Sequence, residues 1–142
     1  MEIEVARIND KFHFKAGNGL AEIPIGAAAS MGDTEHGFRP MQLMLTALAS
    51  CMSIDVLNIL YKKRQTVDDY RVKVAATRTE GVPSIFKTIT VEIHVKGEVK
   101  ASDFTKAIEL SRDTYCSVYK ILKETATIEI KPILNEEEQQ TL

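Results

Sequence analysis

Two cysteines are the residues best suited to chemistry in this sequence. Cys51 lies in the apolar stretch PMQLMLTALASCMSIDVLNILY and Cys116 in DTYCSVYKIL. A thiolate is a nucleophile, and two thiols that meet in space can form a disulfide. In a reducing compartment, two cysteines 65 positions apart are seldom a structural disulfide. We therefore expect either two inert core thiols or a redox pair.

The local sequence gives no reason for Cys51 to ionise. Asp55 follows it by one helical turn, and a negative charge does not stabilise a neighbouring thiolate. A lone cysteine in an apolar helix is usually a small buried hydrophobe, and that interpretation stays open here. Cys116 lies between two expected helices, where the positive N-terminal end of the second would lower a cysteine pKa. Any activation of Cys51 must come from a cation that the fold supplies.

The histidines do not indicate a metal site. His13, His36 and His94 are scattered along the chain, and a metal site would need more ligands than they readily supply. His94 shares a strand face with Glu92 and Lys96, so we interpret it as a solvated strand residue. We therefore expect no metal and no other cofactor.

The bulk composition is that of an ordinary soluble globular protein. The chain has 142 residues, which predicts a single domain over residues 1–142. Hydrophobic residues make up 44%, charged residues 27%, and the net charge is -2, so nothing indicates nucleic acid or an anionic membrane as a partner. No continuous apolar segment opens the chain, so no secretory signal is expected and we predict a cytoplasmic protein.

The apolar stretch 40–61 is long enough to cross a bilayer, but its composition argues against this. A lone ionised Asp near the bilayer centre costs on the order of 3 kcal/mol. Polar side chains also interrupt the stretch at regular intervals: Gln42, Thr46, Ser50, Ser53, Asp55 and Asn58. On a helical wheel they fall on two opposing faces, which favours a helix packed on several sides inside a folded assembly.

Short extended segments are expected before this helix. They cover residues 3–8, 11–16 and 20–25, and Gly17-Asn18-Gly19 is a hairpin signal. Pro40 suits the first helical turn, where a missing N–H costs nothing.

Beyond the helix the hydrophobic period changes to two, which predicts two long half-buried strands over residues 68–78 and 86–99. Ser102 or Asp103 is expected to cap a second helix that runs toward Cys116. A short helix, a closing strand and a frayed acidic tail are expected to follow, over residues 117–124, 126–134 and 135–142.

Three of these segments together resemble a known family. The motifs RPMQLMLTALASCMSIDVLNIL and LSRDTYCSVYKIL, with TRTEGVPSIFKTITVEIHVKG between them, resemble the OsmC-like family, which includes organic hydroperoxide resistance proteins. They are most similar to its small branch of redox proteins, and the resemblance covers residues 38–127. It implies an α+β, OsmC-like fold: an intertwined homodimer in which antiparallel sheets wrap around long central helices.

The resemblance also implies roles for the two thiols. By motif position, Cys51 would be the peroxidatic residue of a thiol peroxidase and Cys116 the resolving one. Such an enzyme reduces organic or hydrogen peroxides at the expense of a thiol reductant and serves the oxidative stress response. A second thiol is needed because it captures the sulfenic acid before further oxidation.

The resemblance is incomplete at the start of the long helix. In hydroperoxide-reducing members a glutamate follows the helix-initiating proline and pairs with an arginine from the N-terminal strands, whereas Met41 stands here. Close relatives often place the glutamate one position later, where this chain has Gln42, a neutral side chain that can still bond an arginine. Arg7, Arg39 and Arg78 are the candidate arginines.

Two other functions remain open at the level of sequence. One is a non-catalytic dimer of the same fold that binds a small ligand in its apolar cleft, with the thiols as lining or as an attachment point. The other is a purely structural dimer with thiols inert to alkylation.

Overall fold

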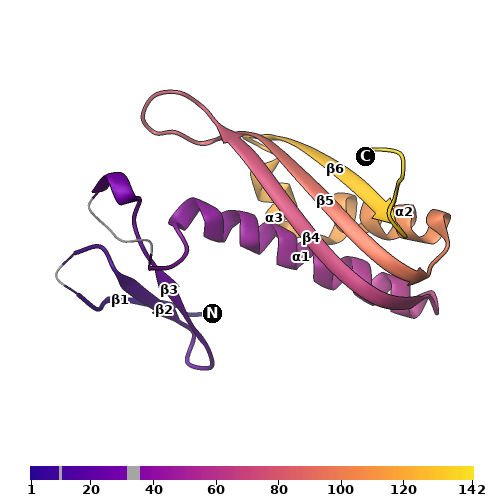
Figure 1. Cartoon of the computed structure of the whole chain (residues 1–142), viewed down its shortest axis with the longest axis horizontal. Helices are drawn as coiled ribbons and strands as arrows, with labels where there is room; N and C mark the ends of the chain where they lie inside the picture. Colours follow the sequence, from indigo (N-terminus) through magenta and orange to yellow (C-terminus); the bar gives the residue numbers. More distant parts are fainter. Residues whose placement is uncertain (10, 32–35) are drawn as a thin grey trace. The chain divides into compact units, whose positions relative to one another are not determined.

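The computed structural model describes residues 1–9, 11–31 and 36–142, in two compact units, Met1–Met44 and Leu45–Leu142. The first unit holds a three-stranded antiparallel sheet, ordered β1 (Glu4–Arg7), β2 (Phe14–Gly17) and β3 (Glu22–Ile25), followed by the 3-10 turn η1 (Ala29–Met31) (Figure 1). The predicted turn joins β2 to β3, where Asn18 Oδ1 accepts hydrogen bonds from the backbone of Leu20 and Ala21.

Helix α1 (Pro40–Lys62) begins and ends where the sequence predicts. Pro40 occupies the first helical position, and Gln42 Oε1 accepts a hydrogen bond of 2.9 Å from the backbone N–H of Arg39. This is the glutamine half of a capping box, which satisfies a donor that the helix itself leaves unpaired. Past the end, Arg64 turns the chain with a positive φ of 57°.

By length and composition α1 passes the test for a membrane span, with a hydropathy of 1.8 over its most apolar window. Core helices of soluble proteins pass the same test. Its buried residues recur every four positions, which is the pattern of a helix packed along one stripe: Leu48, Met52, Val56 and Leu60.

The second unit is built on a four-stranded sheet, ordered β4 (Thr66–Arg78), β5 (Phe86–Glu98), β6 (Thr127–Leu134) and β7 (Glu137–Glu138). The β4–β5 and β6–β7 pairs are antiparallel, but β5 and β6 run parallel. The prediction of antiparallel sheets is therefore wrong at this one pair. Parallel neighbours need a long crossover, and α2 (Ala101–Leu110), the π-helix η2 (Ser111–Tyr115) and α3 (Ser117–Leu122) supply it.

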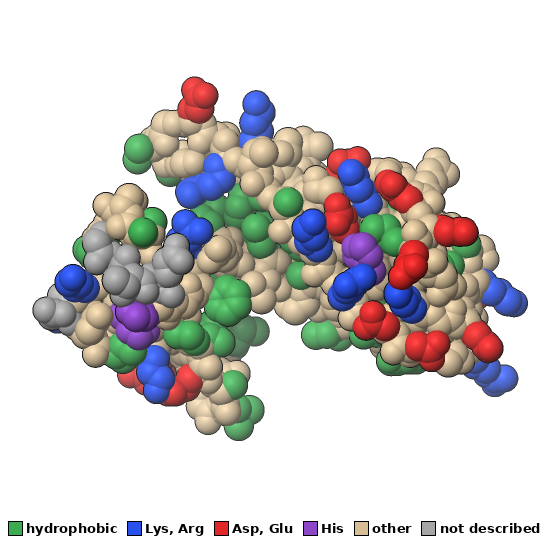
Figure 2. All heavy atoms as spheres, viewed as in Figure 1, with side chains coloured by type: hydrophobic (Ala, Val, Ile, Leu, Met, Phe, Trp, Pro, Cys, Tyr) green, Lys and Arg blue, Asp and Glu red, His purple; other side chains and the backbone are tan. Residues whose placement is uncertain are grey.

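The core of this unit lies on one face of the sheet. On β5 the alternate residues Ile89, Val91, Ile93 and Val95 are at most 1% exposed. The opposite face is charged, as Figure 2 shows for the larger sheet, and His94 lies there 3.8 Å from the Glu92 carboxylate. The prediction of His94 as a strand residue on the solvated face is confirmed, and the architecture is α+β as expected.

Two local predictions are wrong. No side chain caps α2, which starts at Ala101 after Lys100; Asp103 instead lies in its first turn and pairs with Lys63 at 2.8 Å. The acidic tail is not frayed, because β7 pairs with β6 and Leu142 exchanges two backbone hydrogen bonds with Ile130. Backbone pairing to a strand edge overrides the polar composition of the tail.

Candidate functional site

The structure brings both cysteines together with one carboxylate. Cys51 Sγ, Cys116 Sγ and a carboxylate oxygen of Asp55 all lie within 4.8 Å of one another, and we call these three residues the thiol cluster. Both thiols are free. Cys51 and Asp55 share one face of α1, a single helical turn apart, and both are half-buried, whereas Cys116 is 3% exposed.

A π-helix sets the position of Cys116. In η2 the backbone N–H of Cys116 donates to the carbonyl oxygen of Ser111 at 2.8 Å, five residues earlier. The Ser111 hydroxyl in turn donates to Asp55 Oδ2 at 3.0 Å, and Ser111 is completely buried. Ser111 therefore links the backbone of one cysteine to the carboxylate beside the other. Single π turns are rare and are frequent at functional sites.

The environment of Cys116 favours its protonated form. Burial raises the pKa of the Cys116 thiol, and the neighbouring Cys51 sulfur raises it further. The backbone N–H of Tyr119 donates to Cys116 Sγ at 3.3 Å and opposes the shift, because Cys116 is the N-cap of α3. The expected helix-end contact is present, but desolvation outweighs it, so the predicted lowering of this pKa is wrong.

A second buried acid lies near the same helix. The pKa of Tyr70 is raised from 10.0 to about 12, mainly by burial and to a smaller extent by the charge of Asp55. Among the residues that the structure describes, its hydroxyl has no hydrogen-bond partner, although the nearby Ser53 side chain opposes the shift. Ser53 Oγ donates its single proton to the Ala49 carbonyl at 2.7 Å, so it does not donate to the Tyr70 hydroxyl.

A cavity of about 340 Å³ adjoins the thiol cluster through Asp55. Its walls come from the C-terminal half of α1 and from the α2–η2 segment, and they combine apolar and charged side chains. They are Asp55, Asn58, Ile59, Lys62, Lys63, Leu110 and Tyr115. This volume is within the range of small-molecule sites.

The supporting residues expected from sequence are not joined to the thiol cluster by the described contacts. Gln42 bonds the Arg39 backbone, and Arg78 Nη2 donates to the carbonyl oxygen of Ser84 in the β4–β5 connection. Arg7 and Arg39 belong to the first unit, whereas Cys51 belongs to the second. Roles for these residues in activating Cys51 stay predictions.

Sequence reasoning missed Ser111 and Tyr70. Nothing in LSRDTYC marks a π turn, and a tyrosine on an alternating strand is indistinguishable from core packing. Arg112 is a further cation close in sequence to Cys116, but both of its hydrogen bonds, of 2.7 and 2.8 Å, go to Asp113. Its charge is therefore already paired at the surface.

The family model for OsmC-like protein matches residues 32–131. Protein YhfA of Escherichia coli strain K12 is 38% identical over 90 residues, which cover 63% of this chain and 67% of YhfA. Among solved structures, a hypothetical protein from Aquifex aeolicus VF5 superposes with a TM-score of 0.84 at 29% identity, covering 94% of this chain and 95% of that one.

The fold is also that of proteins named for peroxide resistance. The organic hydroperoxide resistance protein OhrB of Bacillus subtilis has a TM-score of 0.66 at 13% identity, with 92% of this chain and 96% of OhrB covered. At that identity the likeness shows the fold alone.

Proposed function

Because the chain belongs to the OsmC-like protein family, we propose that it is a cytoplasmic thiol peroxidase that reduces organic or hydrogen peroxides and works as an intertwined homodimer. The observation that carries this proposal is the approach of Cys51 Sγ and Cys116 Sγ to within 4.8 Å. The family is associated with peroxide resistance, which supports a redox role.

The proposed reaction begins at Cys51, the more accessible of the two thiols. Its thiolate attacks one oxygen of the hydroperoxide, the O–O bond breaks, and the alcohol leaves after taking up a proton. Cys51 is then a sulfenic acid, oxidised by two electrons.

Cys116 completes the proposed reaction. Its sulfur attacks that of the sulfenic acid, the S–O bond breaks, and water leaves as the disulfide forms. A dithiol reductant then returns both cysteines to thiols and is itself oxidised to a disulfide.

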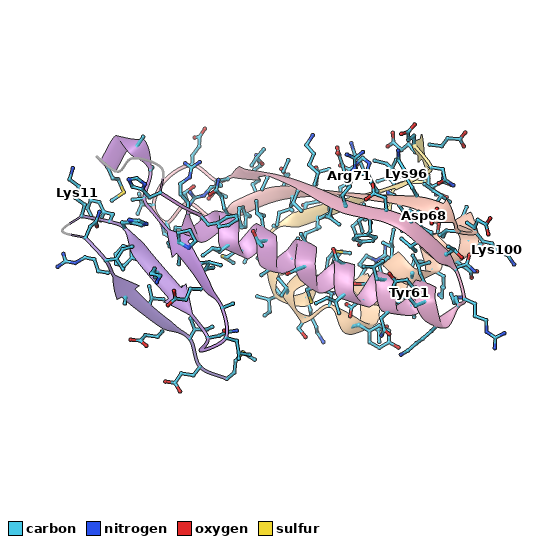
Figure 3. All side chains as sticks on the ribbon, turned by 60° about the horizontal axis from the view of Figure 1, so that its bottom comes forward. Lys11, Tyr61, Asp68, Arg71, Lys96 and Lys100 are labelled. Atoms are coloured by element: carbon cyan, nitrogen blue, oxygen red, sulfur yellow. The ribbon has the colours of Figure 1, made fainter. Side chains whose placement is uncertain are left out.

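The proposed dimer is supported by an exposed stripe on α1. Its residues are spaced alternately three and four positions apart, which is the spacing of helix-on-helix packing. They are the exposed Ala47, Ser50, Ile54 and Tyr61 and the half-buried Leu57. Ile54 is 69% and Tyr61 58% exposed, and Figure 3 shows Tyr61 on the side of the helix away from the strands. An apolar helical stripe of this kind commonly marks an interface.

The first unit supports the same proposal. Its described residues include just two buried ones, Ala16 and Gly26, while many large apolar side chains are exposed. They are Met1, Ile3, Val5, Ile8, Phe12, Leu20, Ile23, Met31, Phe38 and Met44. A three-stranded sheet without a buried face is not stable alone. We propose that residues 1–142 are one domain whose N-terminal sheet is covered in the dimer.

Intact-mass measurement after one equivalent of hydroperoxide, with a chelator present, tests the redox proposal. The wild type is expected to lose two hydrogens as the disulfide forms, which requires the Cα atoms of the two cysteines to come within about 7 Å. Cys116→Ser should gain oxygen atoms instead and reach the irreversible sulfinic state under excess peroxide. Cys51→Ser should consume no peroxide.

Ser117→Ala is the matched control, since Ser117 is exposed and adjoins Cys116 without belonging to the thiol cluster. It should form the disulfide as the wild type does. A wild-type mass that does not change, with both thiols still titratable after unfolding, would contradict the proposal.

The cavity beside Asp55 favours one alternative, a non-catalytic protein that binds a small ligand. Peroxide consumption separates the two functions. A wild type that consumes peroxide no faster than Cys51→Ser would support the binding protein, because the Cys51 thiol would then be incidental to the cavity.

A further inference from the structure

The geometry points to a second use of the thiol cluster: in the reduced protein it binds one thiophilic divalent cation, Zn²⁺ in the cell, through Cys51 Sγ, Cys116 Sγ and an Asp55 oxygen. Two sulfurs and one carboxylate oxygen within 4.8 Å form a mixed ligand set of the kind that zinc takes in proteins. Zinc binding does not depend on peroxidase activity, because it needs only two reduced thiols.

The spacing of the donor atoms suits a tetrahedral cation. With Zn–S bonds of about 2.3 Å and Zn–O bonds of about 2.0 Å, two sulfurs would lie about 3.8 Å apart and a sulfur and an oxygen about 3.5 Å apart. Since no pair in the cluster exceeds 4.8 Å, the two sulfurs need to approach by at most about 1 Å and a sulfur and an oxygen by at most about 1.3 Å. A disulfide demands a much closer approach, to about 2.05 Å.

The carboxylate already has the outer support that metal ligands require. The buried Ser111 hydroxyl donates to Asp55 Oδ2 and fixes the side chain, while no described residue donates a hydrogen bond to Oδ1. Outer hydrogen bonds of this kind orient a ligand and typically change metal affinity by about 10-fold to 100-fold. The carbonyl oxygen of the same residue accepts a hydrogen bond from the Cys116 backbone N–H, so Ser111 positions two of the three ligands.

The three protein ligands leave a fourth position for water or an added ligand, as in open zinc sites. The half-buried side chains of Cys51 and Asp55 provide a route for the cation from solvent. Zn²⁺ binds thiolates, so both thiols release their protons on binding and the complex carries one net negative charge. A disulfide has no thiolates to offer, so the oxidised protein cannot hold the cation in this way.

Cadmium titration of the fully reduced protein, without peroxide, tests the site. One equivalent of Cd²⁺ should produce the ultraviolet charge-transfer absorbance of cadmium thiolates, and Zn²⁺ should displace it. Cys51→Ser and Cys116→Ser should each abolish the tight phase. Asp55→Asn and Ser111→Ala should weaken it by about 10-fold or more.

Histidine variants are the controls for adventitious binding. The rings of His13 and His36 stack with centroids 4.9 Å apart, and His94 lies beside Glu92, so each is a possible surface ligand. His13→Gln and His94→Gln should bind Cd²⁺ as the wild type does. Loss of binding in these variants, or wild-type affinity in Cys51→Ser, would overturn the inference.

Alkylation keeps the inference testable if a cysteine variant fails to fold. In the wild type, one equivalent of Zn²⁺ should slow iodoacetamide modification of both cysteines, and a chelator should restore it. An unchanged alkylation rate would overturn the inference. The redox proposal is tested by mass in the presence of chelator, so either result can fail without affecting the other.

Discussion

Burial decides the chemistry of single residues beside α1 more than nearby charge does. Desolvation is the largest cause of the raised pKa of both Cys116 and Tyr70. A buried neutral thiol at Cys116 is poorly suited to attack peroxide itself. This agrees with the proposal that the more exposed Cys51 attacks the peroxide and Cys116 then forms the disulfide. Tyr70 differs from Cys116 because its hydroxyl lacks a hydrogen-bond partner in the described part of the chain.

Tyr70→Phe should therefore change the alkaline stability of the protein. The pKa of Tyr70 is raised from 10.0 to about 12 in the folded protein. The free energy of unfolding is therefore unaffected by this ionisation below pH 10 and falls as the pH rises from 10 to about 12, because the unfolded chain loses the phenol proton first. The wild type should lose about 3 kcal/mol more unfolding free energy than the variant between these limits. Urea unfolding at a series of pH values measures the difference.

The same comparison has an internal control. Cys116 titrates with a raised pKa in both proteins, so the difference between them isolates the phenol. At neutral pH the variant should be as stable as the wild type or about 1 kcal/mol more stable, because it removes an unpaired buried hydroxyl. A marked loss of stability at neutral pH would mean that Tyr70 does have a partner.

At the residue scale, the sequence identified the candidate side chains but not how they meet. Cys51 and Cys116 were recognisable from their motifs, whereas their approach depends on the crossover from β5 through η2, which periodicity does not reveal. Asp55 could be placed beside Cys51 because helical geometry is local. Ser111 could not, because its hydrogen bond to Asp55 joins residues 56 positions apart.

At the element scale, strong local signals were the reliable ones. Pro40 and the length of the apolar stretch 40–61 predicted the limits of α1, and strict alternation predicted β4 and β5. The start of α2 and the pairing of the tail were wrong because both depend on tertiary contacts, such as the Asp103–Lys63 ion pair and the edge of β6. Polar composition alone does not report an available strand edge.

Gln42 provides a prediction at this scale, because its side chain caps α1. Gln42→Ala should cost about 0.5–1 kcal/mol of unfolding free energy through the lost cap, while Gln42→Glu keeps the acceptor and adds a favourable charge at the helix N-terminus. Gln42→Glu should also raise peroxide turnover, since a carboxylate holds an arginine more strongly than an amide does. Denaturant unfolding and peroxide consumption measure the two effects separately.

The two readouts distinguish a cap from an activating residue. If Gln42→Glu is as stable as the wild type and turns over peroxide at the same rate, the side chain at position 42 only caps α1 and does not activate Cys51. In that case the activating arginine is held by another group, or Cys51 acts without one.

At the scale of the whole molecule, two apolar surfaces are exposed to solvent in the described part of one chain. They are the stripe of α1 and the apolar side chains of the first unit. Obligate homodimers commonly bury 2,000 Å² or more, and few such subunits are stable alone. The sequence predicts this assembly through the hydrophobicity of α1 and through the family resemblance, since the pairing of two copies leaves no local signal.

Ile54→Asp should disrupt the proposed dimer, and Ile121→Asp is its matched control. The two isoleucines are similarly exposed in one chain, at 69% and 67%, but Ile54 lies on the α1 stripe and Ile121 on α3. In a monomer both substitutions would be nearly neutral, because surface changes usually shift stability by no more than about 0.5 kcal/mol. In the dimer, Ile54→Asp places an unpaired charge in an apolar interface and should cost several kcal/mol.

Analytical ultracentrifugation and thermal unfolding at micromolar concentration compare the two variants. The wild type and Ile121→Asp should sediment as dimers with similar melting temperatures. Ile54→Asp should dissociate and unfold at a lower temperature, since α1 and the N-terminal sheet would lose their cover together. A folded wild-type monomer, or equal behaviour of the two variants, would place the interface elsewhere or remove it.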